Sequence, residues 1–213
     1  MALTLPLIPL IIPSLAPTSP QAGLVALESE GLIYGTTWIL YLVSDFLYLV
    51  AFFGLFYALR QFGSGLAKAA VTLNTAFVAL DVGLDIPLRL WMILLSNSYA
   101  ASTVNNPPEI SSAAFAISAS NNVALVATLF QFVALMVVSY LMSKSNSFGR
   151  RTAYIGYATG ILALLFIPAF VAGSQASGLF NIAGFALLAV WSILAGVKLR
   201  KGSLAQLPQR GNL

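Results

Sequence analysis

Residues 32–59 read LIYGTTWILYLVSDFLYLVAFFGLFYAL and contain a single charged side chain, Asp45. A helix of about 20 predominantly apolar residues can cross the hydrocarbon core of a bilayer, so this stretch predicts a membrane-spanning helix. Further stretches of the same kind occupy residues 69–95, 123–142, 153–172 and 179–197. We therefore expect an all-α integral membrane bundle with five transmembrane helices.

The composition of the whole chain also indicates a membrane protein. Of its 213 residues, 59% are hydrophobic and 8% are charged, whereas a soluble domain has about 25% charged residues. So few charges cannot cover a surface that faces water, and most of the surface must therefore face lipid. We expect a multi-pass protein of a prokaryotic cell membrane. The lipid bilayer is then its first partner.

Histidine and cysteine are both absent from the chain. Imidazole and thiolate groups form most zinc, copper, haem and iron–sulfur sites, so we expect no metal site and no cofactor. Catalytic triads with histidine and cysteine nucleophiles are excluded for the same reason. The net charge of +4 does not form a basic stripe with interleaved aromatics on any water-facing segment, so we expect no nucleic-acid partner.

The basic residues predict the orientation of the bundle, because lysine and arginine accumulate in cytoplasmic loops. Glu28, Glu30 and Glu109 fall on one side of the predicted spans, and all but one of the 10 basic residues fall on the other. The exception is Arg89, inside the second span. We therefore expect the N-terminus outside and the C-terminus inside.

The chain divides into a proline-rich apolar segment, residues 1–30, the bundle, residues 31–201, and a cytoplasmic tail, residues 202–213. The first segment has a density of prolines that interrupts helices, and it lacks the positively charged start of a secretory signal peptide. We expect it to lie against the outer leaflet or to pack on the bundle. A sixth, irregular span is the alternative, and it would place the N-terminus inside.

The second predicted span carries ionisable side chains within the apolar sequence ALDVGLDIPLR, residues 79–89. Asp81, Asp85 and Arg89 recur every four residues, so they form one narrow stripe on a helix. Asn74, seven residues before Asp81, extends the same stripe. The sequence therefore predicts a polar face inside the bundle.

The first predicted span places Asp45 near its midpoint, with Tyr41 and Tyr48 at helical spacing on either side. The two spans are antiparallel neighbours joined by a short loop, so we expect Asp45 and Asp81 at similar depth. Pro87 in the second span lacks a backbone donor and is expected to kink that helix.

A charged side chain at the bilayer centre costs about 2.5–3.5 kcal/mol, so this cluster needs internal compensation. Asp85 and Arg89 can pair, but no cation in the predicted spans remains for Asp45 and Asp81. We expect at least one of these carboxyls to hold a proton, because burial and a like charge both disfavour the second negative charge. The cluster is either a site for protons, cations or a polar ligand, or a network that fixes helix packing.

Small residues predict close contacts between helices. The fourth predicted span has Gly156 and Gly160 in a GxxxG pattern, and the fifth has Ser192 and Gly196 at the same spacing. Small residues at this spacing let membrane helices approach closely. Packing within the chain is the preferred interpretation, and contact between protomers is the alternative.

Two enzyme motifs are incomplete in this sequence. Residues 81–85 have the DxxxD spacing of prenyl-transferring membrane enzymes, but the chain lacks the second acidic motif that those enzymes need for magnesium and diphosphate. Intramembrane aspartyl proteases carry GxGD, where this chain reads VGLD at residues 82–85. Asp45 could supply the second carboxylate of such a protease, which stays an alternative. We expect that the protein is not an enzyme.

About half of the chain has a familiar order of features. The first span ends in LFYALR at residues 55–60, LAKAA follows at residues 66–70, a later span ends in YLMSK at residues 140–144, and FGRR opens the next at residues 148–151. This order resembles the prokaryotic multi-pass proteins of the domain of unknown function 4386 family. The resemblance implies a multi-pass membrane protein, usually with six spans, and implies no activity. The proline-rich start departs from the family pattern.

We expect a non-catalytic membrane protein, a packing or accessory subunit of a membrane complex. Its partners would then be other membrane subunits or a second copy of the chain. The alternative is a proton- or cation-coupled carrier of a small solute. The candidate site of that carrier comprises Asp45, Asp81, Asp85, Arg89, Asn74, Tyr41 and Tyr48.

Overall fold

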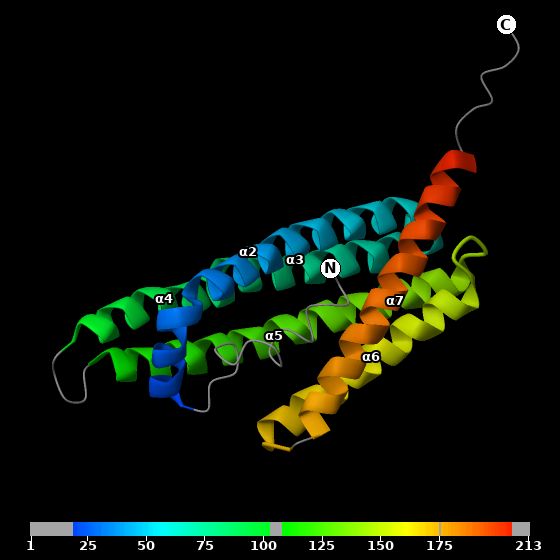
Figure 1. Cartoon of the computed structure of the whole chain (residues 1–213). Coiled ribbons are helices and arrows are strands. Elements are labelled where there is room, and N and C mark those ends of the chain that lie inside the picture. Colours follow the sequence, from blue (N-terminus) through cyan, green and yellow to red (C-terminus); the bar gives the residue numbers. More distant parts are fainter. Residues whose placement is uncertain (1–18, 103–107, 175, 206–213) are drawn as a thin grey trace, which may run out of the picture. The chain divides into compact units, whose positions relative to one another are not determined.

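The structure is a computed structural model that describes residues 19–102, 108–174 and 176–205, with side chains described up to Arg200. These residues are almost entirely helical (Figure 1). The α-helices are α2 (Pro20–Leu59), α3 (Ser64–Leu80), α4 (Ile86–Ala101), α5 (Pro108–Lys144), α6 (Gly149–Val171) and α7 (Ala176–Ala205). A 3-10 turn, Arg60–Phe62, follows α2, and a π-helical turn, Asp81–Asp85, joins α3 to α4. The predicted all-α fold is confirmed for the described residues.

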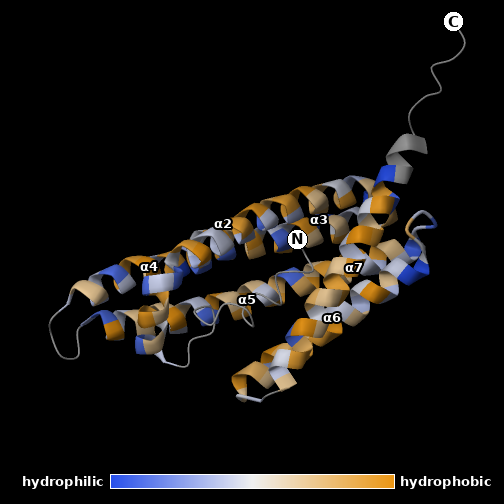
Figure 2. Cartoon of the chain, in the orientation of Figure 1, coloured by the Kyte–Doolittle hydropathy of each residue, from blue (hydrophilic) through white to orange (hydrophobic). Residues whose placement is uncertain are grey.

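Four helical stretches in the described part of the chain are long and apolar enough to cross a membrane. They are Pro20–Phe62, Pro108–Lys144, Gly149–Val171 and Ala176–Arg200, and hydrophobic residues dominate them in Figure 2. The second predicted span, residues 69–95, is divided by the π-turn into helices of 17 and 16 residues. Each is shorter than the roughly 20 residues that a crossing needs. The structure thus indicates a multi-pass membrane protein, and the fifth crossing stays a prediction.

Helix α2 begins at Pro20, within the segment that was expected to interrupt helices. Proline is tolerated at the first helical position because the N–H group there has no partner in the helix. The Ser19 hydroxyl accepts a hydrogen bond from the backbone N–H of Ala22 at 3.1 Å and caps the helix. The Ser96 hydroxyl on α4 donates to the buried carbonyl of Leu24 at 2.7 Å, so the start of α2 packs against α4.

Both ends of the chain extend past the described residues. Helix α7 continues to Ala205, into the segment expected as a cytoplasmic tail. Residues 1–18 and 206–213 lie outside the described part of the chain. The expectations for these two segments, including the sixth span, therefore stay predictions.

Contacts among the described residues divide the chain into two compact units. Unit 1 comprises residues 19–49, 74–102 and 108–131. Unit 2 comprises residues 50–73, 132–174 and 176–205. Helices α2, α3 and α5 contribute to both units.

The core of unit 1 is formed by α2, α4 and the first part of α5. Its buried members are Leu24, Leu27, Tyr34, Trp38, Ile86, Met92, Leu95, Ala113 and Ala116. A fully buried large apolar side chain contributes about 1.5–3 kcal/mol. The outward face of α2 is also apolar, with Phe46 and Leu47 exposed by 48% and 60%. A helix that is apolar on every side suits lipid rather than water as its surroundings.

In unit 2, α5, α6 and α7 pack closely at Gly156 and Gly160. A Cβ atom added at Gly156 would collide with the Ser139 hydroxyl on α5 and lie 2.8 Å from Trp191 Nε1 on α7. A Cβ atom added at Gly160 would collide with Met136 on α5. Both glycines of the GxxxG pattern therefore serve contacts within the chain.

The second pair of small residues is placed differently. Gly196 on α7 is exposed and Ser192 is half-buried. No described atom outside the local backbone lies within 4 Å of a Cβ atom added at Gly196. The face of α7 that carries Gly196 is thus open among the described residues.

Gly156→Ala is expected to lower the free energy of unfolding by about 1–3 kcal/mol, because the added methyl group forces apart closely packed helices. Gly196→Ala is the matched control, since it adds the same group in open space and improves helix propensity by up to about 1 kcal/mol. Thermal unfolding of both variants in detergent micelles measures the difference. Equal melting temperatures would contradict the close packing at Gly156.

Candidate functional site

The π-turn Asp81–Asp85 sets the positions of the ionisable side chains in unit 1. The backbone N–H of Ile86 donates to the carbonyl of Asp81, five residues earlier. Pro87 has no N–H group, so the carbonyl of Gly83 cannot receive the usual α-helical bond from the residue four positions later. The helix widens locally and continues beyond Pro87. Turns of this kind occur frequently at functional sites.

Asp85 and Arg89 form a fully paired half of the site. Arg89 Nε donates to Asp85 Oδ1 at 3.1 Å and to Oδ2 at 3.2 Å. The Ser120 hydroxyl, from α5, donates to the same carboxylate. The side chains of Asp85 and Arg89 are 5% and 18% exposed. This ion pair is therefore buried, and it connects α4 to α5.

Aromatic rings of α2 cover the Arg89 guanidinium. Arg89 Cζ lies 4.4 Å from the centroid of the Trp38 ring, within the range of a cation–π contact. Trp38 in turn stacks on Tyr41 with ring centroids 5.0 Å apart and meets Tyr34 edge-on at 5.9 Å. Asp85 and Trp38 therefore both contact the Arg89 guanidinium, and the ion pair of Arg89 is the one with Asp85.

Asp45 and Asp81 form the other half of the site. Asp45 on α2 is 8% exposed, and its carboxyl group lies beside that of Asp81. Two adjacent carboxylates repel each other, so one shared proton would stabilise the pair. The Asp81 carboxyl also lies near that of Asp85. Asp45, Asp81 and Asp85 therefore form a continuous row of acids, here called the acid chain, that ends at Arg89.

Some buried polar atoms of the site have no partner among the described residues. Asp45 Oδ2 accepts no hydrogen bond, and neither polar atom of the Asn74 amide makes one. Asn74 is 0% exposed and lies on α3, about 10 Å along the helix axis from Asp81. A buried polar group without a partner costs about 1–3 kcal/mol. The site thus retains unsatisfied groups next to a fully paired ion pair.

The predicted site residues all lie in unit 1. Asp45, Asp81, Asp85 and Arg89 come together as one row, in which Arg89 is hydrogen-bonded to Asp85. Asn74 is on the same helical stripe but outside this row. Tyr41 stacks on Trp38, and Tyr48 meets the Phe77 ring edge-on at 6.4 Å, so the two tyrosines border the row along α2.

Comparison with known proteins adds no homologue to this geometry. No family model matches the chain, and neither does a curated protein or a solved structure. The resemblance to the domain of unknown function 4386 family therefore stays a prediction.

Sequence reasoning missed Ser120 and the role of Trp38. The only signal for Ser120 is the polar run SASNN at residues 118–122, which does not distinguish a buried hydroxyl from an exposed one. Trp38 precedes Tyr41 by three residues and Asp45 by seven, a spacing that places all three on one face of a helix. In the part of the chain that the structure describes, no group of three or more acidic side chains is arranged to hold a metal ion.

Proposed function

We propose that this protein is a non-catalytic carrier in a prokaryotic cell membrane that exchanges protons for a small cation at Asp45 and Asp81. The observation that carries this proposal is that the buried Asp45 carboxyl lies beside the half-buried Asp81 carboxyl, while the ion pair of the site joins Arg89 to Asp85 instead. With its proton, the pair has one negative charge. Without it, the pair has two, and a cation must replace the proton to avoid a large electrostatic penalty.

The unsatisfied atoms favour a carrier over a purely structural network. A structural network is stabilising when each buried polar group has its partner, as Asp85 has in Arg89 and Ser120. Asp45 Oδ2 and the Asn74 amide depart from that rule. Acceptor oxygens of this kind suit a cation that is bound only in part of a transport cycle.

We further propose that α3, the π-turn and α4 together form the fifth crossing, with the N-terminus outside and the C-terminus inside. The helical backbone from Ser64 to Ala101 is continuous, and its central polar residues, Asn74 and Asp85, are 0% and 3% exposed. Irregular helical turns at membrane depth are tolerated where they are buried in protein. The excess of basic residues after α2, α5 and α7 supports this orientation.

The test is proton exchange in reconstituted vesicles that contain a pH-sensitive dye and an imposed proton gradient. Sodium or potassium chloride is added outside, and we expect at least one of these cations to release protons from vesicles with the wild-type protein. Asp81→Asn is expected to abolish the release, because an amide cannot exchange a proton in this pH range. The measured quantity is the initial rate of the dye signal.

Glu28→Gln is the matched control for that experiment. It makes the same acid-to-amide change on α2, but at an exposed position outside the site, so the exchange rate should equal that of the wild type. Equal exchange by wild type and Asp81→Asn would remove the pair from the mechanism. No exchange with either cation would contradict the proposed cation specificity.

A packing or accessory subunit is the second candidate function, and the open face of α7 favours it. Ile193 is 59% exposed, Val197 is 47% exposed, and Gly196 between them has no close neighbour among the described residues. Small residues on an apolar face admit a second helix. For a packing or accessory subunit, we expect native mass spectrometry in mild detergent to detect a stoichiometric complex. Gly196→Leu is expected to dissociate this complex.

A further inference from the structure

Unit 2 has positive charge that no carboxylate side chain of the unit balances. Residues 50–73 and 132–213 contain no aspartate or glutamate. The basic side chains described in this unit are all exposed; they are Arg60, Lys68, Lys144, Arg150, Arg151, Lys198 and Arg200. These cations therefore attract anions from outside the unit.

Helix contacts bring these cations to one end of unit 2. The turn between α2 and α3 packs on the end of α5, because a Cβ atom added at Gly63 would lie 3.1 Å from Leu141. The end of α2 also lies beside the end of α7, since a Cβ atom at Gly54 would lie 3.8 Å from Leu199. A short turn joins the end of α5 to the start of α6. Every basic segment of the unit thus converges on the same end.

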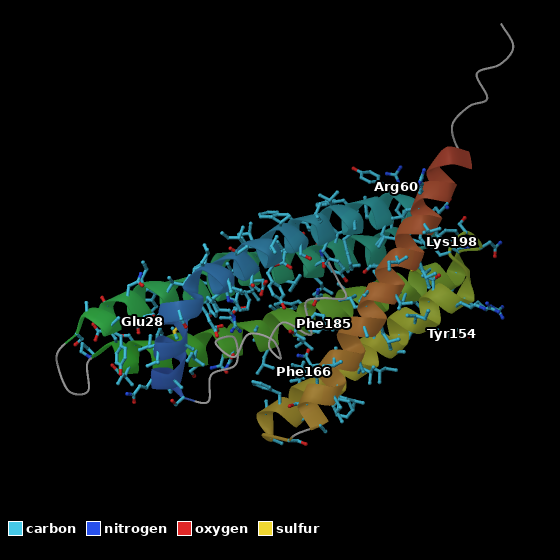
Figure 3. All side chains as sticks on the ribbon, in the orientation of Figure 1. Glu28, Arg60, Tyr154, Phe166, Phe185 and Lys198 are labelled. Atoms are coloured by element: carbon cyan, nitrogen blue, oxygen red, sulfur yellow. The ribbon has the colours of Figure 1, made fainter. Side chains whose placement is uncertain are left out.

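The antiparallel pair of α6 and α7 completes this arrangement. Gly156, near the start of α6, packs against Trp191, two helical turns before Lys198 on α7. In Figure 3, Arg60 and Lys198 lie at this shared end, and Phe166 lies toward the opposite end of α6. Positive charge and apolar surface are therefore separated along the helices of unit 2.

Tyrosine rings accompany the cations. Arg60 Cζ lies 5.4 Å from the centroid of Tyr57, and Lys144 Nζ lies 5.3 Å from that of Tyr140. These rings are 65% and 43% exposed, and Tyr154 on α6 is 64% exposed. Tyrosines of membrane helices concentrate where hydrocarbon meets the lipid headgroups. The tyrosines therefore mark the headgroup level, and the cations lie at the same level.

We propose that this end of unit 2 binds the phosphate headgroups of anionic phospholipids. The three exposed arginines, Arg60, Arg150 and Arg151, can each bind a phosphate group through two parallel hydrogen bonds, and the lysines add charge at short range. A lipid fits better than a nucleic acid or an acidic protein, because the cations begin where the apolar helix surfaces end. One phospholipid can then occupy both surfaces, with its chains along the helices and its phosphate at the arginines.

Native mass spectrometry of the whole chain, stripped of lipid in a neutral detergent, tests this proposal. Equal amounts of phosphatidylglycerol and phosphatidylcholine compete for the protein, and we expect the wild type to retain mainly phosphatidylglycerol. In the variant Arg150→Gln, Arg151→Gln, each lost cation is expected to reduce this preference by about fivefold. The charge-conserving variant Arg150→Lys, Arg151→Lys is the matched control, and it should keep most of the preference.

Several outcomes would overturn the proposal. One is equal retention of the two lipids by the wild type. Another is full displacement of the lipid by inorganic phosphate, which would identify free phosphate as the ligand. A third is tight binding of an acidic peptide without any lipid preference, which would indicate a protein partner. If the glutamine variant does not fold, the lysine variant still tests the site. It keeps both positive charges, so a folded lysine variant with no preference for phosphatidylglycerol would contradict a role for these charges.

Discussion

Arg89→Met is expected to lower the free energy of unfolding by about 3–5 kcal/mol, because it leaves Asp85 buried with no counter-charge. Arg89 contributes both hydrogen bonds of the ion pair, at 3.1 and 3.2 Å, and methionine contributes neither. Methionine also removes the guanidinium from the Trp38 ring, where Arg89 Cζ now lies 4.4 Å from the centroid. The loss is measured by thermal or denaturant unfolding in detergent micelles.

A second substitution separates lost charge pairing from lost packing. Adding Asp85→Asn to Arg89→Met removes the uncompensated carboxylate, while the amide oxygen can still accept the hydrogen bond from Ser120. We expect the double variant to recover most of the lost stability. Arg150→Met, at an exposed position of α6, should leave stability within about 0.5 kcal/mol of the wild type. If the double variant is as unstable as Arg89→Met, the electrostatic explanation is wrong.

Much of the site follows from periodicity. The four-residue spacing of Asp81, Asp85 and Arg89 and the short connection between the first two spans predict that Asp45 approaches the same stripe. The sequence does not reveal which of these side chains contact one another, because those contacts depend on where the α-helix changes to a π-turn. A missing N–H at Pro87 predicts a disturbance, but only tertiary packing decides between a kink and the π-turn that the structure has.

Helix ends and the packing of small residues also depend on tertiary contacts that the sequence does not reveal. The apolar run predicts α2 from residue 32, but the helix begins at Pro20, because the buried Leu24 and Leu27 stabilise the first turns through tertiary contacts. Likewise, Gly156 and Gly196 belong to identical spacing patterns, and only Gly156 is closely packed. A spacing shows which residues share a face. It does not show what that face contacts.

The double variant Asp45→Leu, Asp81→Leu is expected to be more stable than the wild type, by about 1–4 kcal/mol. It replaces two acids that lie outside the ion pair of Asp85 and Arg89 by apolar side chains of the same branched shape, and it removes the unsatisfied Asp45 Oδ2 atom. It leaves Asp85 paired with Arg89 and Ser120. The same variant should have no proton exchange in vesicles. Unfolding and exchange are measured on one preparation, so that a loss of exchange cannot be attributed to a loss of fold.

The contrast with Asp85→Leu makes this prediction specific. Like the double variant, this single substitution replaces an acid of the acid chain by leucine. It leaves Arg89 without its carboxylate, however, and is expected to destabilise the protein by about 3–5 kcal/mol. Opposite signs for the two variants mean that Asp85 maintains the structure, whereas Asp45 and Asp81 are retained at a cost to stability. Groups retained at such a cost are typical of functional sites. If the double variant is instead as unstable as Asp85→Leu, Asp45 and Asp81 are structural and the carrier proposal loses its main support.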